Sequence, residues 1–240
     1  MVPVHRKVAI VVLATGLILC GCQDNRASLQ LRVPLDRQYV LSEHSDRPIL
    51  VSLPGDQPFN IHIKQRSENP GYEGSAESES KANADGKALC STEVANGGSA
   101  TAEFTIGHRI ANQTDHPQSL AVELDCQWRQ SLQSSTDPEA DTIARADLQI
   151  LVLDAKGKIL ATIPVLKTDS DQARASAELH DQRKLSISIE PQTRYDIILT
   201  GKVEAQSAAG QEASARLEIN DLKINLSFTS GQKETTQTKP

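Results

Sequence analysis

Residues 100–129 have the sequence ATAEFTIGHRIANQTDHPQSLAVELDCQWR, and this stretch decides the fold. Apolar and polar side chains alternate on both sides of a polar turn at residues 112–118. Strict alternation is typical of β-strands with one buried face, because successive side chains point to opposite sides of a strand. The stretch therefore predicts two long strands joined by a turn. The side chains predicted to face the interior are Ala102, Phe104, Ile106, His108, Ile110, Leu120, Val122, Leu124, Cys126 and Trp128.

The last third of the chain repeats this alternation. Apolar or small residues occupy every second position over 185–189, 195–205 and 215–228, with one irregularity. The step from Ile219 to Leu222 spans three positions instead of two. A single slip of phase within a long strand predicts a β-bulge at that point.

Between these regions, residues 146–154 and 158–167 form a predicted hairpin around the turn at 155–157. Both of its strands are apolar on both faces. Strands of this kind are typical of the middle of a sheet, where both faces are covered. We therefore expect a central position for this hairpin.

Many short strands separated by turn signals, with few or no helices, predict an all-β fold and an antiparallel β-sandwich, immunoglobulin-like or jelly-roll-like. We expect one domain over residues 29–229 and a disordered tail over 230–240. Residues 67–99 are poor in large apolar side chains. They are interpreted either as a flexible insertion or as an edge meander, and the turn dipeptides within them favour the meander.

The beginning of the chain carries a targeting signal. A basic start is followed by an apolar run over residues 8–19, shorter than the roughly 20 residues that a spanning helix needs. The run ends in Leu19-Cys20-Gly21-Cys22. This motif resembles the lipobox of bacterial lipoprotein signal peptides. The resemblance implies a signal peptide over 1–21, a lipid attached to Cys22, and a polar tether over 22–28.

That resemblance places the protein in the cell envelope, lipid-anchored to a membrane. Asp24 follows the lipid-bearing residue at the second place, which favours the outer membrane in a Gram-negative host and the cell membrane otherwise. In an exported compartment, Cys90 and Cys126 are the remaining pair of cysteines and are expected to form a disulfide. The alternative is two separate buried thiols.

The charge balance and the absence of certain motifs argue against several classes of function. The chain has 25 Lys and Arg against 31 Asp and Glu, which argues against nucleic acid as a partner. No histidine pair has metal-site spacing, and no serine acyl-enzyme or phosphate-loop motif occurs. His108 is interpreted as a core histidine. We therefore expect no catalytic residue, no metal and no cofactor.

Two function classes remain, with a hydrolase less favoured than either. The first is a structural or partner-binding envelope lipoprotein. The second is a carbohydrate-binding surface module that binds polysaccharide. The last two strands, with Tyr195 after a polar turn and a closing strand through Phe228, resemble the end of jelly-roll carbohydrate-binding modules. Sugar platforms usually need exposed aromatic rings, however, and only Tyr39 and Tyr72 are predicted to be free, which favours the first class.

Overall fold

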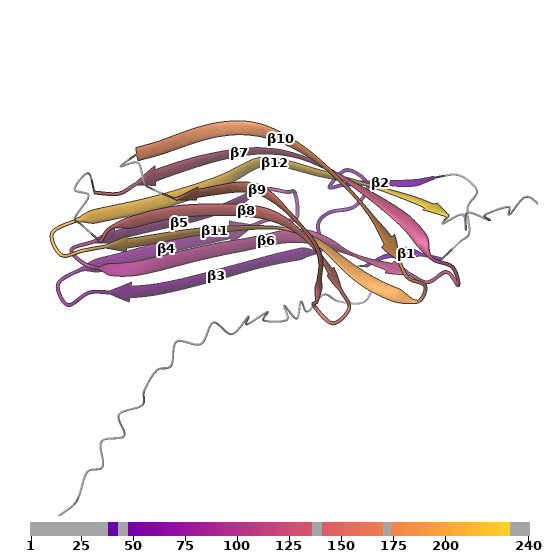
Figure 1. Cartoon of the computed structure of the whole chain (residues 1–240), viewed down its shortest axis with the longest axis horizontal. Helices are drawn as coiled ribbons and strands as arrows, with labels where there is room; N and C mark the ends of the chain where they lie inside the picture. Colours follow the sequence, from indigo (N-terminus) through magenta and orange to yellow (C-terminus); the bar gives the residue numbers. More distant parts are fainter. Residues whose placement is uncertain (1–37, 43–47, 136–140, 170–173, 231–240) are drawn as a thin grey trace, which may run out of the picture.

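The computed structural model describes residues 38–42, 48–135, 141–169 and 174–230. They form twelve strands in two sheets that pack face to face (Figure 1). This confirms the predicted all-β antiparallel sandwich. Within these ranges, no helix is long and apolar enough to cross a membrane.

Sheet A has the order β1-β6-β11-β8-β9. The strand β3 pairs with residues 98–107 of β6, on the same edge where β1 pairs with residues 110–112. All of its pairs are antiparallel except β1 with β6. Its strands are β1 (Tyr39–Leu41), β3 (Ile61–Pro70), β6 (Gly98–Asn112), β8 (Ile143–Asp154), β9 (Ile159–Asp169) and β11 (Thr193–Ser207).

Sheet B has the order β10-β7-β12-β5-β4, and β2 pairs with β12 beside β5. The two strands of the opening stretch, β6 and β7, therefore belong to different sheets. Its strands are β2 (Ile49–Leu53), β4 (Ser75–Ala82), β5 (Ala88–Ala95), β7 (Gln118–Gln133), β10 (Arg174–Ile189) and β12 (Glu212–Ser230).

The predicted bulge in the last strand is confirmed. The register between β12 and β7 shifts between Ile219 and Asp221, and both Ile219 and Leu222 point into the core. The bulge also separates two neighbours of β12, because β5 pairs with residues 212–219 and β2 pairs with residues 224–228.

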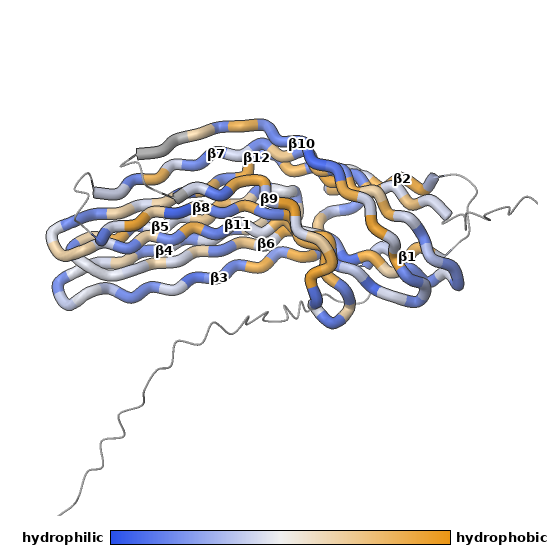
Figure 2. Tube along the Cα trace, in the orientation of Figure 1, coloured by the Kyte–Doolittle hydropathy of each residue, from blue (hydrophilic) through white to orange (hydrophobic). Residues whose placement is uncertain are grey.

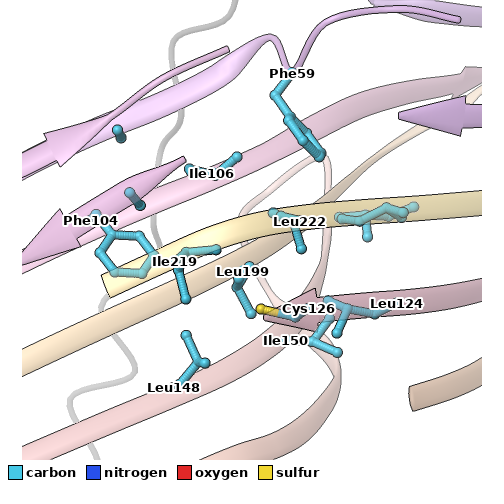
Figure 3. Close-up of a cluster of buried hydrophobic side chains, with 14 of the residues drawn as sticks. Phe59, Phe104, Ile106, Leu124, Cys126, Leu148, Ile150, Leu199, Ile219 and Leu222 are labelled. Carbon is cyan, nitrogen blue, oxygen red and sulfur yellow. The ribbon is translucent and has the colours of Figure 1, made fainter. Parts of the chain in front are cut away.

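The core fills the space between the sheets, and all ten predicted interior side chains of the opening stretch are buried. Figure 3 shows part of this core, with the sulfur of Cys126 pointing toward Leu199 of the opposite sheet. Gly201 lies directly opposite Phe104 in the β11–β6 pair. A Cβ at Gly201 would overlap the Phe104 ring, so the phenyl group fills the space that the glycine leaves.

Two expectations about strand placement are resolved. Residues 67–99 include the end of β3, all of β4 and β5 and the start of β6, so the segment is built of strands. The edge meander is matched only in part, because β4 and β5 pair as a hairpin at the edge of sheet B whereas β3 and β6 pair with each other in sheet A. The hairpin β8–β9 is central only in part, because β8 lies between β11 and β9 whereas β9 pairs with β8 alone and is an edge strand. The central position expected for the second strand is therefore wrong.

Candidate functional site

The predicted lipid attachment site, Cys22, lies outside the described residues, as do residues 1–37 as a whole and the tail from 231 onward. His108 is buried on the inner face of β6, as predicted for a core histidine. Within the described ranges, no cluster of three or more His, Cys, Asp or Glu side chains is placed to hold a metal ion.

Cys90 and Cys126 are both buried and both free, so the predicted disulfide is wrong. Cys90 pairs with Leu217 and Cys126 pairs with Leu222, so the cysteines lie on the two strands that flank β12 in one sheet. Two strand spacings separate their Cα atoms by roughly 9–10 Å, and the offset along β12 adds more. A disulfide needs Cα atoms within about 7 Å. Burial raises the pKa of both thiols, that of Cys126 to about 12, which makes them poor nucleophiles at neutral pH.

A cavity of about 390 Å³ lies beside β6, between the connection from β2 to β3 and the turn from β4 to β5. Its apolar wall consists of Pro58, Phe59 and Ala84. Its polar groups are two imidazoles and three carboxamides, from His62, His108, Gln38, Gln57 and Asn60.

The side chain of Asn60 indicates which ring nitrogen of His108 carries the hydrogen. Its Oδ1 accepts a hydrogen bond from the backbone N–H of Arg109 at 3.0 Å. Its Nδ2 must therefore donate toward Nε2 of His108, 3.4 Å away. Because Nε2 is then an acceptor, the imidazole hydrogen is assigned to Nδ1.

This Nδ1 is buried and makes no well-aligned hydrogen bond. Burial lowers the pKa of His108 to about 4, and the nearby Pro58 carbonyl opposes this only in part. The ring is therefore neutral at pH 7. The Oε1 atom of Gln38, which also lines the cavity, is buried and unpartnered as well. The cavity wall thus has one buried polar atom without a partner, Oε1 of Gln38, and one, Nδ1 of His108, whose acceptor is the poorly aligned Pro58 carbonyl. Such atoms normally have a well-aligned partner.

Behind the cavity, a buried ion pair joins β6 to β11. Arg109 donates from Nε and Nη2 to the two carboxylate oxygens of Asp196, both at 2.6 Å. The side chains are 14% and 7% exposed. The Asp196 carboxylate raises the pKa of Arg109, so the guanidinium stays charged. The pair holds β6 and β11 in register beside His108.

Exposed aromatic rings are scarce. All seven aromatic residues of the sequence fall in the described ranges. Tyr72 is fully exposed in the connection from β3 to β4, and Tyr39 is half-buried and stacks on Phe228 with ring centroids 5.7 Å apart. A flat platform of two exposed rings is therefore not formed. The buried rings are Phe59, Phe104, Trp128, Tyr195 and Phe228.

The edge strand β9 is apolar at its beginning. Ile159 and Leu160 are 45% and 44% exposed, and Figure 2 shows an apolar stretch along the bent part of β9. The register with β8 omits Leu160, so the strand bulges there and places two consecutive apolar side chains at the surface.

The cavity and the surface of β9 are two candidate sites for contact with a ligand or a partner. The cavity presents imidazole and carboxamide groups, and no carboxylate is among its described lining residues. Sequence reasoning missed the roles of Gln38 and Asn60, because both lie in connections where no periodic pattern marks them. It identified His108 as buried but not as part of a cavity.

No protein-family model matches the chain, and no curated protein matches it. Among solved structures, a chain in the structure of the infectious bursal disease virus Gt strain is 12% identical in sequence, with a TM-score of 0.24. The match covers 78% of this chain and 38% of the viral chain. The family 11 carbohydrate-binding module from Clostridium thermocellum has 9% identity and a TM-score of 0.22, covering 73% of this chain and 94% of the module. The CBM22-1 xylan-binding domain from Paenibacillus barcinonensis Xyn10C has 9% identity and a TM-score of 0.19, covering 77% and 97%. Similarities this low carry no conclusion about function, and the β-sandwich assignment stands on the strand pairing itself.

Proposed function

We propose that this chain is a lipid-anchored protein of the cell envelope whose β-sandwich binds a partner protein and does not catalyse a reaction. The lipobox-like Leu19-Cys20-Gly21-Cys22 supports the anchor at Cys22. Acyl chains contribute about 0.8 kcal/mol per buried CH₂, and two or more give stable attachment. The membrane is the outer membrane in a Gram-negative host and the cell membrane otherwise.

The observation that carries the partner-binding role is the mismatch between the sequence of β9 and its position. Residues 159–166 contain no charged side chain and are largely apolar on both faces, a composition typical of strands covered on both sides. The strand nevertheless lies at a sheet edge, with Ile159 and Leu160 substantially exposed. A partner that covers this surface removes the mismatch.

The other edge strands differ in polarity. The short edge strand β2 has the apolar sequence ILVSL, and its Leu50 is 73% exposed. The sequence of β4 is SAESESKA, and β3 becomes polar after Ile63. The edge strand β10 carries an ion pair between Arg183 and Asp181, a kind of charge placement that discourages further strand pairing. Among the described edges, β9 is the longer apolar strand, and two consecutive large apolar side chains are exposed at its start, whereas β2 exposes Leu50 alone.

The contact at β9 is made through side chains. The bulge at Leu160 and the second register shift near Pro164 interrupt the edge backbone that strand addition would use. We therefore place an apolar segment of the partner against Ile159 and Leu160.

Site-specific photo-crosslinking in the native envelope tests this proposal. A photoreactive residue replaces the exposed Thr162, and the experiment is repeated with Leu160→Lys and with the control Leu179→Lys, which alters a 55% exposed leucine on the edge strand β10. We expect cross-linking to one protein that Leu160→Lys abolishes and Leu179→Lys preserves. Cross-links that survive Leu160→Lys, or that form only within the chain, would overturn the β9 contact.

The anchor is tested separately. Cys22→Ser should move the natively expressed protein from the membrane fraction to the soluble envelope fraction. Continued recovery in the membrane fraction would show that the lipid at Cys22 is not the anchor. The β9 cross-link does not depend on this result.

A further inference from the structure

We infer that the cavity beside β6 is a binding site for an uncharged saccharide unit. This site is separate from the β9 surface and does not depend on it. The cavity volume of about 390 Å³ falls within the range of small-molecule pockets, about 300–1,000 Å³. A single ordered water occupies only about 30 Å³, so the space is far larger than one bridging water needs.

The lining excludes charged ligands. Its described residues include no Lys, Arg, Asp or Glu, and His108 is held neutral by its burial and by Asn60. The second imidazole, that of His62, lies on the exposed side of the cavity. A carboxylate, phosphate or ammonium group placed beside His108 would lose its hydration without gaining a counter-charge from the buried part of the lining, which is costly. The ligand is therefore uncharged.

The lining also excludes a purely apolar ligand. The Nδ1–H group of His108 is a buried donor without an aligned partner, and Oε1 of Gln38 is a buried acceptor without one. An apolar ligand would leave Oε1 of Gln38 without a partner and His108 with the poorly aligned Pro58 carbonyl. A hydroxyl group suits both, because one hydroxyl can accept a hydrogen bond and donate another.

The arrangement of the walls favours a ring that has both polar and apolar surfaces. Phe59 and Pro58 form an apolar wall, whereas the carboxamides and imidazoles supply the hydrogen-bonding groups. A saccharide ring has C–H faces and hydroxyl edges, so it matches both kinds of surface. This site is a pocket for one unit and differs from a flat aromatic platform.

Saturation-transfer NMR on the whole lipidated chain tests the inference. The protein is held in a detergent without sugar headgroups, since such headgroups would compete for the cavity. The probes are the methyl β-glycosides of glucose, galactose and N-acetylglucosamine, with glucuronate and glucosamine as charged comparators. We expect saturation transfer to at least one neutral glycoside and none to the charged sugars.

Three variants locate the binding. His108→Phe removes the donor, and Gln38→Leu removes the acceptor from a connecting segment, which keeps the test valid if the core substitution prevents folding. Each should weaken binding roughly tenfold, the loss expected for one good hydrogen bond to the ligand. The matched control is His180→Phe, because His180 is exposed on β10 and lies outside the cavity.

The inference is overturned if no neutral glycoside shows transfer, if a charged sugar binds equally well, or if Gln38→Leu and His180→Phe bind alike. None of these results bears on the cross-link at β9, so failure here and failure of the partner-binding proposal are distinguishable.

Discussion

Acidification should destabilise this protein through His108. The pKa of this imidazole is lowered from 6.5 to about 4 in the folded chain, chiefly by desolvation. The unfolded chain therefore binds a proton at pH 5, where the folded chain does not. The contribution of His108 to stability is fully present above pH 6.5 and is lost as the pH falls toward 4.

The magnitude follows from the shift. One pKa unit corresponds to about 1.4 kcal/mol, so His108 removes about 2 kcal/mol from the free energy of unfolding by pH 5 and about 3 kcal/mol by pH 4. With a urea m-value of roughly 2–3 kcal/mol/M, the larger loss lowers the unfolding midpoint by about 1 M.

Urea unfolding at a series of pH values between 4 and 8 measures this effect in the original chain and in His108→Gln, whose side chain does not titrate. Subtracting the two curves removes the contribution of every other acid and base. We expect the stability of the original chain relative to the variant to fall with decreasing pH. A difference that stays constant from pH 7 to pH 4 would refute the burial argument for His108.

Three further predictions concern packing, thiols and charge. Gly201→Ala places a methyl group against a buried phenyl ring and should cost about 1–3 kcal/mol in urea unfolding; an unchanged midpoint would contradict the packing described. Cys90 and Cys126 should resist a thiol reagent in the folded protein and react on unfolding without reductant, whereas a disulfide-linked peptide in the mass spectrum would contradict their separation. Asp196→Ala removes the carboxylate that pairs with the largely buried guanidinium of Arg109 and should cost about 3–5 kcal/mol. Glu178→Ala, which removes an exposed ion pair, should cost much less than Asp196→Ala, and equal costs would contradict the difference in burial.

The interior faces of the strands could be predicted because alternation is a local property. Every second residue from Ala102 to Ile110 and from Leu120 to Trp128 points inward, since each side chain is opposite in direction to its neighbours. The bulge after Ile219 was predictable for the same reason, because a phase slip shows in the sequence itself.

The candidate site was not predictable in the same way. His108 was identified as a buried residue, but its cavity also needs Gln38 and Asn60, which come from connections and meet β6 only in the folded chain. Residues in connections do not belong to an alternating apolar and polar pattern, so no such pattern identifies them. Their chemistry depends on which segments lie beside β6.

The sequence by itself determined the strands with clear alternation, their inner faces, the β12 bulge and the charge balance. Tertiary structure alone decided that β6 and β7 belong to different sheets, that β9 is an edge, and that Cys90 and Cys126 flank β12 too far apart to join. The physical reason is that side-chain direction is set by neighbouring residues, whereas strand pairing joins segments distant in the chain and is fixed by which apolar faces can be buried together.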